Sequence, residues 1–166
     1  MASAAAALPL HAVAVLADID ASGARALLAR HALALVRVED GAPIPGSYWG
    51  EPEAGVIGAC VYARADTPVH SLLHEACHLI VAPADRRAAI HTDASTSQAE
   101  EDATCYLQIL LADALPGIGR ERLMADMDAW GYSFRLGSAR EWFLRDAEDA
   151  REWLRIRGLL PDSTPA

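Results

Sequence analysis

The segment DTPVHSLLHEACHLIVAP, residues 66–83, carries the pentapeptide HEACH at residues 74–78. Its Asp-Thr-Pro opening and closing proline are typical of the two ends of a helix. Histidines four positions apart lie on one face of a helix, so His74 and His78 can reach one tetrahedral Zn²⁺ at about 2.0–2.1 Å from each nitrogen. Glu75 is offset from them by about 100°. Its position predicts a general base that takes a proton from a zinc-bound water and passes it to a leaving group.

The surroundings of this pentapeptide favour the metal site over a coincidence. Leu72, Leu73 and Leu79 flank it and can anchor the helix in a core. The alternative is an amphipathic helix whose histidines only line a polar face. In that case the chain is an all-helical bundle and binds no metal.

A catalytic zinc site needs a third protein ligand and an open fourth position. The downstream candidates, all of ligand-forming types, are His91, Asp93, Glu100, Glu101, Asp102 and Cys105. A histidine six positions after the second one is excluded as the ligand, because Ala84 stands there. This rules out the metzincin pattern.

The remaining pattern resembles the gluzincins, the zincin metallopeptidases in which a following helix supplies a glutamate within E-x-x-A-(D or N)-x-(F or Y). The chain reads EEDATCY over residues 100–106. Alignment on Ala103 and Tyr106 makes Glu100 the expected metal ligand, with Glu101 in reserve. The helical period agrees, because Glu100 shares a face with apolar residues that should pack inward.

Two features qualify this alignment. Thr104 stands where the family has Asp or Asn to orient a ligating histidine, and a hydroxyl is a weaker orienting group than a carboxylate. Ser97 lies three residues before Glu100, so the two could instead form a capping box at the start of a helix.

The resemblance covers residues 54–115 and implies an α+β, zincin-like fold. We expect a mostly helical chain with a small, partly antiparallel sheet packed on the active-site helix, and a substrate lying extended along the sheet edge above the zinc. Local patterns predict a first helix over 22–36 and a buried strand over 56–64. The chain, residues 1–166, is expected to form one domain with a mobile tail at 160–166.

Five further side chains are candidates near the site. Tyr132 and Arg135 lie between glycines and could hold the oxyanion of the reaction, or could simply form a corner in which Arg135 pairs with an acidic neighbour. His70, one turn before His74, could contact substrate or lie on the surface. Cys77 and Cys105 are expected to be buried thiols rather than redox groups or ligands.

The composition limits the partners. The net charge of −9 repels phosphate groups and argues against nucleic acid or an anionic membrane surface, but leaves room for a basic protein partner. Few cysteines, an odd number of them and the lack of a basic signal region favour a cytoplasmic location. No apolar run reaches the roughly 20 residues that span a bilayer.

We therefore expect a zinc-dependent peptidase that acts on a specific protein or peptide substrate. A domain of this size leaves little room for the long cleft of a general protease. The alternative is a zinc-stabilised regulatory or interaction module without turnover, in which His70 or Cys105 closes the metal as a fourth ligand.

Overall fold

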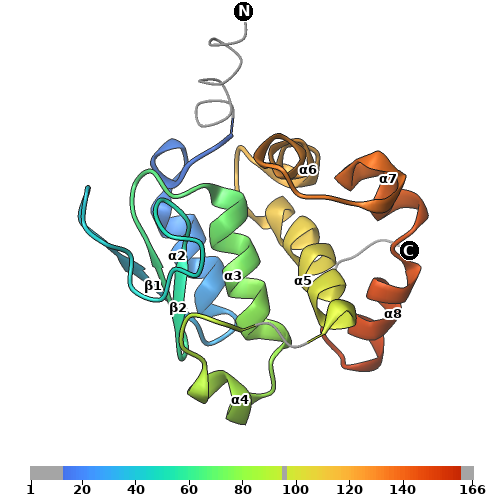
Figure 1. Cartoon of the computed structure of the whole chain (residues 1–166), viewed down its shortest axis with the longest axis horizontal. Coiled ribbons are helices and arrows are strands. Elements are labelled where there is room, and N and C mark those ends of the chain that lie inside the picture. Colours follow the sequence, from blue (N-terminus) through green and yellow to red (C-terminus); the bar gives the residue numbers. More distant parts are fainter. Residues whose placement is uncertain (1–12, 95–96, 162–166) are drawn as a thin grey trace, which may run out of the picture.

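The computed structural model describes residues 13–94 and 97–161. Helices dominate it, and a small sheet lies in the N-terminal half (Figure 1). The helices are η1 (Leu16–Asp18), α2 (Ala21–Ala29), α3 (Val69–Val81), α4 (Ala84–Ala89), α5 (Gln98–Leu111), η2 (Ala112–Ala114), α6 (Gly119–Trp130), η3 (Arg135–Gly137), α7 (Ala139–Arg145) and α8 (Glu148–Ile156). The strands are β1 (Ala34–Arg37), β2 (Gly55–Ile57) and β3 (Cys60–Ala63). The expected α+β class is confirmed.

The sheet is mixed, with strand order β1-β3-β2. Strand β1 pairs parallel with β3 in the register Leu35 with Val61, and β2 pairs antiparallel with β3 in the register Val56 with Val61. Helix α3 packs on this sheet, as predicted. Figure 1 shows α3 at the centre, with the sheet and α2 on one side and α5 on the other.

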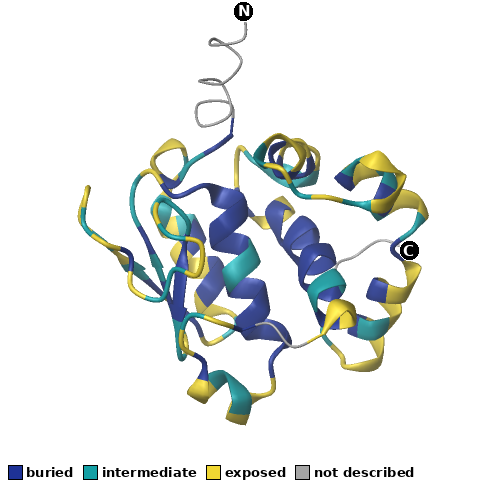
Figure 2. Ribbon diagram, in the orientation of Figure 1, coloured by how far each residue is buried: buried dark blue, intermediate teal, exposed yellow. Residues whose placement is uncertain are grey.

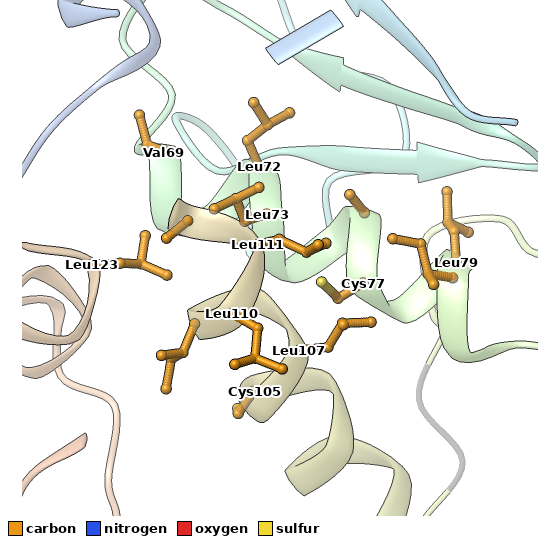
Figure 3. Close-up of a cluster of buried hydrophobic side chains, with 14 of the residues drawn as sticks. Val69, Leu72, Leu73, Cys77, Leu79, Cys105, Leu107, Leu110, Leu111 and Leu123 are labelled. Atoms are coloured by element: carbon orange, nitrogen blue, oxygen red, sulfur yellow. The ribbon is translucent and has the colours of Figure 1, made fainter. Parts of the chain in front are cut away.

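The core lies where α3 meets α5. Nearly all of α3 is buried, and every residue of 103–112 is buried as well (Figure 2). Leu72, Leu73 and Leu79 of α3 are fully buried, and Figure 3 shows Leu72 on the side of the sheet and Leu73 beside Leu111 of α5. Deletion of one such leucine side chain typically costs 2–5 kcal/mol. The HEACH helix is therefore held from both sides along its length.

Two predicted elements differ from the structure. The predicted helix over 22–36 ends after Ala29, and residues 34–37 form β1 instead. Between them Ala32 has a φ of 59°, a left-handed conformation that breaks the helix. The predicted strand over 56–64 is two strands, because a turn at Gly58, with a φ of 58°, reverses the chain.

The outer edge of β2 is covered. The Val56 N–H donates to the Gly46 carbonyl at 3.2 Å, and the Val56 carbonyl accepts from the Thr92 N–H at 2.9 Å. Glycine is needed for this close approach, since a Cβ on Gly55 would lie 1.9 Å from the Pro45 carbonyl oxygen. The expectation of a substrate strand paired with this edge is therefore corrected, because both outward backbone groups of Val56 already have partners.

Two further expectations concern the limits of the chain. Of the tail predicted over 160–166, residues 162–166 lie outside the described residues, and Leu160 packs against the core. Within the described ranges, no helix has the length and apolar character needed to cross a membrane.

Candidate metal centre

Three side chains from α3 and α5 converge on one point. The His74 Nε2 and His78 Nε2 atoms lie 3.1 Å apart. Glu101, on α5, places its Oε1 atom 3.0 Å from the His74 nitrogen and its Oε2 atom 3.0 Å from the His78 nitrogen. The histidines come from successive turns of one helix, so the spacing seen in the sequence is sufficient to align them.

These three side chains fit a zinc ion. Ligands bound at about 2.0–2.1 Å in tetrahedral geometry are separated from one another by about 3.3 Å. The observed separations of 3.0–3.1 Å among the donor atoms are close to this value. Two imidazoles and one carboxylate are also a ligand set used by catalytic zinc sites, which keep a fourth position open.

Gln108 orients His74. The Gln108 amide nitrogen donates to the His70 carbonyl at 3.1 Å, so its oxygen faces His74, where it lies 2.6 Å from Nδ1. An amide oxygen only accepts, so the Nδ1 atom of His74 carries the proton. In the neutral ring the lone pair of Nε2 then points toward His78 and Glu101. This is the arrangement that a metal ligand requires.

The charges of the site also favour a cation. Burial alone would raise the pKa of Glu101, but its hydrogen bonds to His74 and His78 hold that pKa far below the ordinary range. Burial would lower the pKa of His74, yet its hydrogen bond to the Glu101 carboxylate acts in the opposite direction, and the pKa is raised above its usual value. The carboxylate that favours positive charge on these imidazoles would also favour a cation bound between them.

The structure places Glu101, and not the expected ligand Glu100, beside the two histidines. Glu100 points away from the histidines. Its carboxylate forms an ion pair with Arg86 of α4, in which Oε1 lies 2.6 Å from the Arg86 Nη2 atom. Its backbone N–H donates to the Ser97 side chain at 3.2 Å, as the capping alternative required. The apolar pattern could not show which face of α5 meets the histidines, because this helix is buried on nearly every side. Glu101, offset from Glu100 by about 100°, is the residue that faces α3.

Cys105 lies close to the candidate ligands. His74, Glu101 and Cys105 form a group whose possible ligand atoms all lie within 4.8 Å of one another. The thiol is buried, and this burial raises its pKa although His74 acts in the opposite direction. Cys77 is also buried, on the core side of α3 (Figure 3), and burial raises its pKa strongly. Both are free thiols, and only Cys105 adjoins the site.

The buried His70 and the partly buried Tyr132 form a layer behind the site. His70 is fully buried, so the reading of it as a surface residue is wrong. Its Nδ1 lies 3.1 Å from the Tyr132 hydroxyl, and the Tyr132 ring packs edge-on against His74 with centroids 5.8 Å apart. Burial raises the pKa of Tyr132, which keeps the phenol protonated. Because Tyr132 contacts both histidines, its position suits a role in supporting the ring of His74. The role predicted for it was instead to hold an oxyanion.

Arg135 lies outside the site. Its guanidinium makes two bonds of 2.6 and 2.7 Å to Asp146, and its side chain is 80% exposed. The predicted oxyanion role is therefore corrected, since the alternative of a pair with an acidic neighbour is the one observed.

The site opens into a cleft of 230 Å³. Glu75 lines this cleft beside His74 and His78. Burial raises the pKa of Glu75, while the two histidines act to lower it. The other walls are made by Tyr48 and Trp49 and by residues 92–94, the two segments next to the covered edge of β2.

Sequence reasoning missed Gln108 and the aromatic wall. Gln108 carries a detectable signal, because it is the only polar residue in the run 107–112 and lies seven positions, or two helical turns, after Glu101. Tyr48 and Trp49 lie in a loop rich in glycine and proline, which the sequence alone does not place near the histidines.

Replacement of Gln108 with methionine should weaken zinc binding by about 10–100-fold, the usual cost of losing a group that orients a ligating histidine. Methionine keeps the volume of the side chain but cannot accept from His74 Nδ1. A competitive titration with a zinc chelator measures this change. Thr104→Val is the matched control: the Thr104 hydroxyl donates to the Glu100 carbonyl at 2.8 Å, so its loss should leave zinc affinity unchanged. Equal affinities for Gln108→Met and the wild type would contradict this role.

No protein-family model, curated protein sequence or solved structure matches this chain significantly. The function is therefore inferred from the geometry of the site.

Proposed function

We propose that this protein is a zinc-dependent peptidase of the zincin type that acts on a specific protein substrate. One observation carries the proposal: the Nε2 atoms of His74 and His78 lie 3.1 Å apart and each lies 3.0 Å from one of the two carboxylate oxygens of Glu101, in a cleft that Glu75 also lines. Bound zinc would polarise the scissile carbonyl and make a water molecule more acidic.

The residues of this chain have distinct roles in the proposed reaction. His74, His78 and Glu101 hold the metal, and Gln108 fixes the ring of His74. Glu75 takes the proton from the attacking water and delivers it to the leaving amine. The raised pKa of Glu75 suits this exchange, since a base whose pKa lies closer to neutrality can both accept and return a proton.

The size of the cleft supports a narrow choice of substrate. At 230 Å³ it lies below the usual range of about 300–1,000 Å³ for ligand pockets. It could admit one or two side chains of a polypeptide. A substrate would then have to be recognised at few positions, which favours one or a few protein partners over general digestion.

Metal content and peptide cleavage test this function together. Protein purified without added metal should contain about one zinc per chain, and it should cleave members of a complex peptide mixture, as detected by mass spectrometry. Removal of the metal by a chelator should stop cleavage, and zinc should restore it. A protein that takes up no zinc after dialysis against the metal would exclude the proposal.

A second candidate function is favoured by the position of Cys105 near His74 and Glu101. In this reading the thiolate is a fourth ligand, and the closed zinc site only stabilises a regulatory module. X-ray absorption separates the two, because a sulfur ligand lies at about 2.3 Å and nitrogen or oxygen ligands at about 2.0–2.1 Å. For the peptidase we expect no sulfur in the shell and full zinc binding by Cys105→Ala. A sulfur signal that this variant loses would favour the regulatory module.

A further inference from the structure

An exposed aromatic corner borders the candidate site. Trp49 is 75% exposed and Tyr48 56% exposed, and their rings meet edge to face with centroids 5.0 Å apart. Both line the same cleft as Glu75 and the two histidines. Two large aromatic side chains left in solvent at the mouth of a polar cleft suit contact with a ligand.

The rest of the cleft offers carboxyl groups and little aliphatic surface. Among the described residues that line it, Ala94 is the only aliphatic one, whereas Glu75, Asp93 and Glu101 contribute carboxyl groups. The surrounding stretch 38–63 contains four acidic residues and no lysine or arginine. Burial raises the pKa of one of them, Glu53. The nearby Glu75 carboxylate raises it further.

The covered edge of β2 makes side-chain recognition more important. A substrate cannot pair with the outward backbone groups of Val56, because Gly46 and Thr92 already bond to them. Substrate contacts must therefore come from the side chains around the cleft. Tyr48 and Trp49 directly follow the covering segment at Gly46, which holds them at the cleft.

We infer that the Tyr48–Trp49 corner binds an arginine or lysine side chain of the substrate, with the cation over the Trp49 ring and the cleft carboxylates nearby. This inference depends on the proposed peptidase function and specifies its substrate class. A guanidinium stacks on indole while keeping part of its hydration, so an open ring suits it. A leucine or phenylalanine side chain would find almost no aliphatic surface in the cleft, and it would gain nothing from the acidic walls.

Binding of three hydroxamates to the zinc-loaded protein tests the inference without any need for turnover. N-acetylated hydroxamates of arginine, citrulline and leucine share the same zinc-chelating group. Citrulline has nearly the shape of arginine but no charge. We expect calorimetry to show arginine hydroxamate binding about two- to fivefold tighter than the citrulline compound, as a cation over an exposed ring predicts. This advantage should shrink as the salt concentration rises.

Two variants assign that preference to the corner. Trp49→Ala should remove the advantage of arginine over citrulline, and Trp49→Phe should retain part of it. Leu144→Ala is the matched control, because Leu144 is also exposed, at 57%, but lies on α7 outside the cleft. Circular dichroism checks that each variant is folded.

The possible outcomes separate the two proposals. If none of the three compounds binds the zinc-treated protein, the metal site itself fails. Equal binding of all three, or tightest binding of the leucine compound, overturns the inference while leaving the metal site intact. A preference for arginine that survives in Trp49→Ala also overturns it, because the selectivity would then come from elsewhere.

Discussion

Glu101→Gln should lower the zinc affinity of the protein by more than about 100-fold, while Glu100→Gln should leave this affinity at the wild-type value. Loss of a group that only orients a ligand already costs about 10–100-fold, so loss of the ligand itself should cost more. Glu101 contacts both histidine nitrogens at 3.0 Å, whereas Glu100 is bound to Arg86. Zinc affinity measured by competition with a chromophoric chelator checks this prediction.

The two substitutions form a matched pair. They are neighbours on the same helix, both exchange a carboxylate for an amide of equal size, and each removes an ion pair. Thermal unfolding of the metal-free proteins should therefore reveal any general loss of stability separately from metal binding. If Glu100→Gln loses zinc and Glu101→Gln retains it, α5 must rotate on binding the metal, and the original alignment on Ala103 and Tyr106 would be the correct one.

The one-residue difference between these glutamates shows what the sequence could predict. The HEACH helix follows from local rules, since capping, apolar flanks and the i, i+4 spacing all lie within 66–83. The third ligand depends on how α5 is rotated against α3. The apolar pattern fixes such a rotation only when a helix has one buried face, and α5 is buried on nearly every side.

The polar residues of α5 carry the information that its apolar residues lack. Glu101, Cys105 and Gln108 recur at intervals of four and three positions, so they share one face. This face meets His74 in the structure, through contacts from Glu101 and Gln108. A helix that is buried on nearly every side is therefore oriented better by its polar side chains, each of which needs a partner when buried.

The covered sheet edge is a different case, because no local pattern predicts it. It depends on backbone bonds from Val56 to residues ten positions before and thirty-six positions after it in the chain. Gly46 and Gly55 permit the close approach, but a glycine in a loop has many possible reasons. The expectation of a substrate lying along the sheet edge came from the family resemblance, and the backbone bonds to Val56 do not support it at β2.

Glu75→Gln should keep the metal and lose the reaction. The amide retains the size of the side chain but cannot accept a proton, so we expect peptide cleavage to fall by about 10²–10⁴-fold, the usual contribution of general acid–base catalysis. Zinc affinity should stay near that of the wild type, because the donor atoms of the site come from other residues. Asp102→Asn is the control, since this carboxylate lies one residue from Glu101 but outside the cleft. Cleavage that persists in Glu75→Gln would mean that another group takes the proton. Loss of zinc in the same variant would place Glu75 on the metal, at a position where the helical offset from His74 should keep it away.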